Sequence, residues 1–150
     1  MASLDLQLLD AVVAKLREAG GPTGLTVHES QNRPIDDDQL PSIVVYPFGE
    51  APVEQPEHDE ASYLELPLVL ECRAKGDPGH RAVDPLYVWA VHQMMIDQQW
   101  GGLAEHTHFD GREWAETPSG AVYGRLALRF RIQFWTGEYD VENPPVKADD

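Results

Sequence analysis

The sequence has few cationic residues, one cysteine and no long apolar run, and each shortage excludes a class of protein. Eleven Lys and Arg stand against 26 Asp and Glu, a net charge of −15 over 150 residues. Nucleic-acid clamps and proteins that bind anionic membranes need the opposite sign, because both ligands are negatively charged. Cys72 alone cannot form an internal disulfide, which predicts a reducing compartment. No apolar run approaches the roughly 18 residues that span a bilayer.

Motifs for nucleotide or nucleophilic chemistry are missing as well. No glycine-rich motif offers a phosphate cradle. Ser119 lies in a Pro-Ser-Gly turn rather than in a nucleophile elbow. Cys72 continues an apolar row, where a thiol is a small core residue rather than a nucleophile. We therefore expect a protein that is not an enzyme and that uses no cofactor.

Two stretches of the sequence have helical periodicity. The first predicts an amphipathic helix from Ser3 or Asp5 to about Ala19, ended by two glycines. The second is predicted from Asp84-Pro85, a cap followed by proline at the first helical position, to about Gln98. The apolar stripe of the first helix is expected to comprise Leu6, Leu9, Val12, Val13 and Leu16.

Alternation of apolar and polar residues predicts two long strands, over 63–73 and 121–136. Pro67 cannot donate a ladder hydrogen bond, so the first of them is expected at a sheet edge or to carry a bulge there. Shorter strands are predicted at 25–28, 42–46 and 106–110, followed by a turn at 111–113 and a further short strand opening at Trp114.

This order predicts an α+β fold: a mostly antiparallel β-sheet with two helices packed on one face, in a two-layer single domain. The domain is expected to cover residues 1–137. The polar, acidic C-terminal tail, 138–150, is expected to be flexible or ordered by a partner.

Two surfaces look suited to assembly. The second helix is apolar in nearly every direction, and one small core can cover only one side, so a neighbouring subunit is expected to cover the rest. The last strand carries a row of arginines on its polar face, and Arg and Trp are enriched in interface hot spots. In the alternative interpretation, this row only answers Glu65 and Glu71 within the sheet. The predicted interface comprises Tyr87, Val88, Trp89, Met94, Met95, Arg125, Arg129, Arg131 and Trp135.

His106, His108 and Asp110 form the best candidate metal site. In an extended segment their side chains point to the same side, and imidazole suits zinc or copper. A structural zinc needs four ligands and a catalytic zinc three plus water, and no other motif completes the set. A small metal-dependent enzyme that uses these residues therefore stays the alternative from a different functional class.

The sequence also resembles the tail terminator, or tail completion, proteins of long-tailed bacteriophages. The likeness covers about residues 4–140 and lies in the order of its segments: LDLQLLDAVVAKL, LPSIVVYPFGE, YLELPLVLECRAKG, DPLYVWAVHQMMID, GGLAEHTHFDG and GRLALRFRIQFWTGEYD. It implies a ring, typically a hexamer, that caps the tail tube and joins it to the head. DNA would pass through the ring unbound, and an acidic lumen fits that role.

The resemblance further implies a place and partners for the protein. The place would be the tail–neck junction of the virion, reached after synthesis in the host cytoplasm. The partners would be the tail tube protein and a head–tail connector protein. Another neck component, such as a head-closure or connector protein, is the alternative within the same class. The residues expected to meet tube or connector are Glu50, Glu54, Glu57, Asp59, Glu60 and Tyr139.

Overall fold

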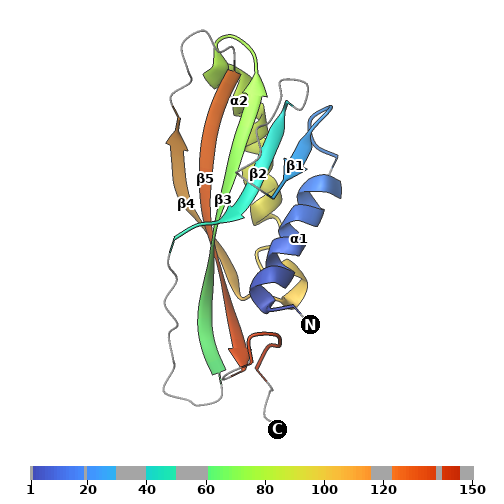
Figure 1. Cartoon of the computed structure of the whole chain (residues 1–150), viewed down its shortest axis with the longest axis vertical. Helices are drawn as coiled ribbons and strands as arrows, with labels where there is room; N and C mark the ends of the chain where they lie inside the picture. The colour runs from blue at the N-terminus through green and yellow to red at the C-terminus, as the bar shows by residue number, and fades with distance from the viewer. Residues whose placement is uncertain are drawn as a thin grey trace.

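The computed structural model of the chain describes residues 2–18, 20–29, 40–49, 61–115, 123–137 and 140–145. Figure 1 shows a long sheet with helices beside it. In chain order the elements are α1 (Leu4–Glu18), β1 (Thr26–His28), β2 (Ser42–Pro47), β3 (Ala61–Lys75), α2 (Gly79–Met95), η2 (Trp100–Gly102), β4 (His106–Trp114) and β5 (Tyr123–Gly137).

The strands form a single five-stranded sheet in the order β1-β2-β3-β5-β4. β1 and β2 are parallel, and the other neighbours are antiparallel. The two long strands pair along their whole length, as their matching alternation predicts. Both helices lie on the same face of this sheet (Figure 1). The predicted α+β fold with a mostly antiparallel sheet is confirmed.

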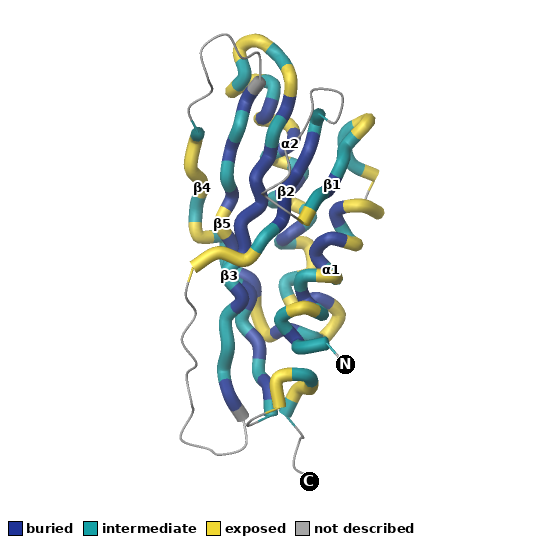
Figure 2. Tube along the Cα trace, in the orientation of Figure 1, coloured by how far each residue is buried: buried dark blue, intermediate teal, exposed yellow. Residues whose placement is uncertain are grey.

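The core lies between the helices and this inner face of the sheet (Figure 2). The apolar residues of the alternation in β5 are buried, and Cys72 of β3 is buried in the same layer as expected. They are Leu126, Leu128, Phe130, Ile132 and Phe134. The stripe of α1 is rotated from the prediction: Leu6 is 46% exposed, whereas Leu4 and Leu8 are fully buried. The N-terminus of α1 is capped as predicted, because the backbone N–H of Leu6 donates to Ser3 Oγ at 3.2 Å.

The predicted start of the second helix at Asp84-Pro85 is wrong. α2 begins at Gly79, after Pro78, whose extended backbone occupies the cap position. Pro85 therefore lies inside the helix, where it can make no hydrogen bond to the carbonyl of Arg81 four residues earlier. The helix ends at Met95, a little before the predicted Gln98, and Asp97 accepts hydrogen bonds from the backbone of the turn that follows.

The prediction that Pro67 places its strand at a sheet edge, or gives it a bulge, is wrong: β3 is an inner strand and has no bulge at Pro67. β3 lies between β2 and β5, and its register with β5 runs unbroken through Pro67. Pro67 is tolerated because β2 has ended at this point: the Pro67 carbonyl accepts from Phe48 N at 3.1 Å, and its nitrogen points to the same, vacated side. The bulge occurs in β4 instead, between Phe109 and Gly111.

β4 also differs from its prediction. The turn expected at 111–113 and the separate strand at Trp114 are parts of one strand, which pairs with β5 on both sides of the bulge. The extra residue at the bulge is Asp110, and a bulge of this kind bends the strand without ending its pairing.

Part of the predicted flexible tail is held by the chain itself. In the described segment 140–145, the carbonyl of Val141 accepts from Leu4 N at 2.6 Å and that of Glu142 accepts from Gln7 Nε2 at 3.0 Å. These bonds satisfy donors at the start of α1, so no partner is needed to order this part of the tail. Among the described residues, no helix is long and apolar enough to cross a bilayer.

Candidate functional site

The candidate site is the outer face of the sheet, on the side away from the helices. Its centre is the carboxylate of Glu71 on β3, which is only 4% exposed. Arg73 donates to Glu71 Oε1 from Nη2 at 2.6 Å and from Nε at 2.9 Å, and Arg125 of β5 pairs with the same oxygen. Strand pairing explains the cluster, since Arg73 and Arg125 are directly opposite each other and Glu71 is two residues from Arg73.

A second cluster on this face surrounds Arg131 of β5. Its Nε donates to Asp110 at 2.6 Å and its Nη1 to Glu65 at 3.1 Å. Glu65 also accepts from Gln133 Nε2 at 2.9 Å, and Gln133 Oε1 lies 2.8 Å from His108 Nε2. Asp110, two residues after His108 in the same alternation and the extra residue of the bulge in β4, reaches this guanidinium on the outer face.

Arg129 lies between these two clusters and has a different environment. Its Nη2 donates to Glu113 at 3.0 Å, and its guanidinium carbon lies 5.4 Å from the ring centre of Phe48. Phe48, Val69 and Arg129 line part of an open hollow of about 340 Å³. Phe48 is 53% exposed, and sequence analysis missed it because a single aromatic residue after a strand carries no periodic signal.

The ion pairs bear out the intra-sheet interpretation of the arginine row, which is compatible with a contact to another subunit. Arg125 pairs with Glu71 and Arg131 with Glu65, as the intra-sheet alternative predicts, while Arg129 pairs with Glu113. Each arginine of the row therefore has a carboxylate partner within the chain. Its contact with another subunit stays a prediction, now for a surface whose charges are already matched.

The pKa values of Glu71 and Tyr46 on this face depart from their ordinary values. Burial of the Glu71 carboxylate raises its pKa, but hydrogen bonds from Arg73 and Arg125 outweigh this effect and hold the pKa below 4.5. The pKa of the Tyr46 phenol is raised, first by burial and then by the nearby charge of Glu71. Glu71 is thus a permanently ionised anchor for two arginines at neutral pH.

The predicted interface residues of α2 do not share one environment. Met94 is fully buried in the chain's own core and cannot meet a neighbour, so that part of the prediction is wrong. Tyr87, Trp89 and Met95 are partly buried and pack against the core. Val88 is 60% exposed and remains available.

The chain itself covers most of α2, which removes the need for a neighbour on every side. The ring of Trp89 lies against Gly21, where an added Cβ would be only 2.7 Å from it. On the other flank Tyr87 faces Phe109 of β4, with their ring centres 6.5 Å apart. The exposed apolar surface of α2 and its C-cap is therefore a narrow row that includes Val88 and Ile96.

Trp135, the remaining predicted interface residue, lies on the outer face near the end of β5. Its ring centre is 4.7 Å from that of Tyr63 on β3, and its Nε1 donates to Glu105 at 2.5 Å. Both the ring and the polar tip therefore have partners within the chain, and the side chain is half-buried.

The structure does not assemble the candidate metal site. The rings of His106 and His108 lie edge to face, 4.3 Å apart, but Asp110 is held by Arg131. In the part of the chain that the structure describes, no three His, Cys, Asp or Glu side chains are grouped so that they could hold a metal ion. Two imidazoles alone fall short of a zinc site.

We expect metal analysis of the purified protein to find less than one zinc per chain. The reason is that binding through Asp110 would break its ion pair with Arg131. The control is His108→Ala, which should leave the metal content unchanged. Stoichiometric zinc that disappears in this variant would contradict the expectation and restore the metal-dependent alternative.

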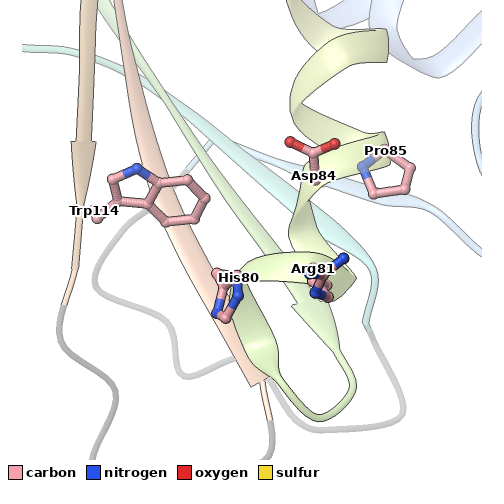
Figure 3. Close-up of a pocket in the computed structure, with 5 residues that line it drawn as sticks. All are labelled: His80, Arg81, Asp84, Pro85 and Trp114. Atoms are coloured by element: carbon pink, nitrogen blue, oxygen red, sulfur yellow. The ribbon is translucent and has the colours of Figure 1, made fainter.

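A second hollow, of about 370 Å³, lies between the end of β4 and the first turns of α2 (Figure 3). Trp114, 46% exposed, lines one side of it and Asp84, His80 and Arg81 line the other. The sequence signal for this site was hidden by the wrong helix start, because residues 79–83 were not assigned to α2.

The expected tube or connector contacts cannot be placed. Glu50, Glu54, Glu57, Asp59, Glu60 and Tyr139 all lie outside the described residues, as does the acidic segment 50–60 that contains most of them.

Comparison of the chain with protein-family models and with curated proteins finds no match in either set.

Proposed function

We propose that this chain is a structural protein of a bacteriophage virion, a tail terminator that forms a ring, with six copies as the expected number. The ring would close the completed tail tube and join it to the head-side connector at the tail–neck junction. DNA would pass through it without specific binding. The proposal is supported by the order of helices and strands along the chain and by the family resemblance that accompanies it.

The observation that carries the proposal is the position of the exposed apolar side chains. Val88 and Ile96 protrude from the helix layer, 60% and 59% exposed, and Phe48 is exposed on the opposite, outer face of the sheet. The chain already has a complete core beneath them. In a ring, a heterologous contact uses two different faces of each copy, and these side chains would lie in it on both.

Light scattering over a range of protein concentrations tests the ring. We expect a mass of several chains, six being the predicted number, and a larger complex when tail tube protein is added. The physical reason is that the exposed apolar side chains lose their contact with water only in the assembly. A monomer at every concentration, also with tube protein present, would contradict the proposal.

Electron microscopy of tails assembled without the protein separates the terminator from other neck components. A missing terminator leaves the tube without a stop, so we expect overlong tails. Tails of normal length that fail to join heads would instead support the head-closure or connector alternative.

A further inference from the structure

Net charge limits how copies of this chain can meet. Each copy carries −15, so most surfaces repel their equivalents on another copy at close range. Screening at physiological salt reduces this repulsion beyond about 8 Å but not in a contact. Assembly therefore favours those faces on which charge is absent or already matched.

The outward row of α2 is one such face. The stretch from Pro85 to Ile96 contains no Asp, Glu, Lys or Arg. Pro85, Val88, His92 and Ile96 are exposed at helical spacing, on the side away from the buried Leu86, Ala90 and Met94. Ile96 comes eight positions after Val88, and a rise of 1.5 Å per residue places their side chains about 12 Å apart along the helix axis.

The outer face of the sheet is the other. Its ion pairs join four arginines to four carboxylates, so these charges cancel: Arg73, Arg125, Arg129 and Arg131 with Glu65, Glu71, Asp110 and Glu113. Between the pairs lies the 340 Å³ hollow, with Phe48 at its rim and Pro67 and Val69 among its lining. Neither α1 nor α2 covers this face, and no other helix among the described residues does (Figure 1).

We infer that the outward row of α2 in one copy packs on the outer sheet face of the next. Val88 and Ile96 are the protruding side chains, and the hollow beside Phe48 receives one of them. The inference rests on the proposed function, since it specifies the contact that closes the ring. Two different faces meet, so the contact is heterologous, the type that generates rings. The neighbour's helix then becomes the second layer over a sheet that its own chain covers on one side.

Cysteine cross-linking tests which faces meet. Val88→Cys and Phe48→Cys are prepared as separate full-length variants and treated with a short bis-maleimide, alone and mixed. The native Cys72 is fully buried and does not compete. We expect a cross-linked dimer only in the mixture. Val141→Cys, at a matched exposure of 49% in the C-terminal segment, is the control and should cross-link with neither variant.

The other outcomes overturn the inference in distinguishable ways. A dimer of Val88→Cys alone, or of Phe48→Cys alone, would mean that like faces meet. No cross-link in a wild-type protein that light scattering shows to be oligomeric would place the contact elsewhere and leave the ring intact. A wild-type monomer would overturn the ring and this contact together.

A charge placed in the contact gives an independent measurement. Because Val88→Lys adds a cation that must lose its water against a face whose carboxylates are already paired, we expect the concentration for half-assembly to rise at least tenfold. Val141→Lys, the control, should leave it within about twofold. Unfolding temperatures near that of the wild type for both variants would show that assembly, and not folding, has changed. Equal assembly of Val88→Lys and wild type would overturn the inference.

Discussion

Gly124→Ala is expected to cause the largest loss of stability of any single methyl addition to β5. A Cβ at this buried position would lie 2.5 Å from the carbonyl carbon of Gly79 and 3.1 Å from Cβ of Val83. The nearest group is backbone, so the start of α2 would have to move away from the sheet. We expect the free energy of unfolding to fall by about 3 kcal/mol and Tm by about 10 °C in thermal unfolding.

Gly137→Ala, in the same strand, is the matched control. Its added Cβ would approach only the Asp140 side chain, at 3.3 Å from Cβ, and a side chain can shift where backbone cannot. We expect a change below about 1 kcal/mol. Equal losses in the two variants would show that the packing of α2 on β5, on which the Trp114 hollow also depends, is looser than described.

The alternation of apolar and polar residues predicted correctly those strands whose partner in the sheet alternates in the same way. β3 and β5 alternate over matching lengths, so their pairing and the burial of Cys72 followed from the sequence. The position of β3 inside the sheet did not, because Pro67 is compatible with a central strand only where the neighbour stops. β2 ends at Pro47, opposite Leu68, and this end leaves room for Pro67 in an inner strand. The residues that neighbour Pro67 in the sequence carry no information about where β2 ends.

The start of α2 was missed because two local signals compete. Asp84-Pro85 is a regular start signal, and Pro78-Gly79 is read equally well as a turn. Close packing of the first turn on Gly124 favours the earlier start, and that contact joins residues far apart in the sequence. The hollow beside Trp114 exists only because α2 begins at Gly79, since His80 and Arg81 of its first turn line one side.

The sequence also overestimates the apolar surface of α2, because contacts with residues far away in the sequence cover part of it. A helical wheel shows that Tyr87 and Trp89 flank the buried row, but it cannot show that β4 and the turn at Gly21 lie against them. What remains exposed is the row through Val88 and Ile96, a smaller interface than predicted. Its position opposite the matched ion pairs of the sheet could not be derived from the sequence, since the pairs themselves depend on register.

Those ion pairs make Glu71→Gln the second variant with a large expected effect. The carboxylate is 4% exposed and anchors Arg73 and Arg125, so the amide leaves two guanidinium groups without their shared anion. Removing one partner of a buried pair costs about 3–5 kcal/mol. Arg125 is 39% exposed and can turn to water, so we expect about 2 kcal/mol at pH 7, measured by urea unfolding.

The effect of Glu71 should also depend on pH, with a sign fixed by its lowered pKa. A carboxyl group with a folded pKa below its ordinary 4.5 stabilises the fold above about pH 4.5, and this contribution is lost as the pH falls through the folded value. The wild type should therefore lose its advantage over Glu71→Gln progressively as the pH falls below about 4.5. Glu113→Gln, which breaks an exposed pair with Arg129, is the control and should cost below about 1 kcal/mol at pH 7. An advantage over Glu71→Gln that does not depend on pH in acid would mean that the amide disturbs packing, and that the Glu71 charge does not hold the two arginines on this face.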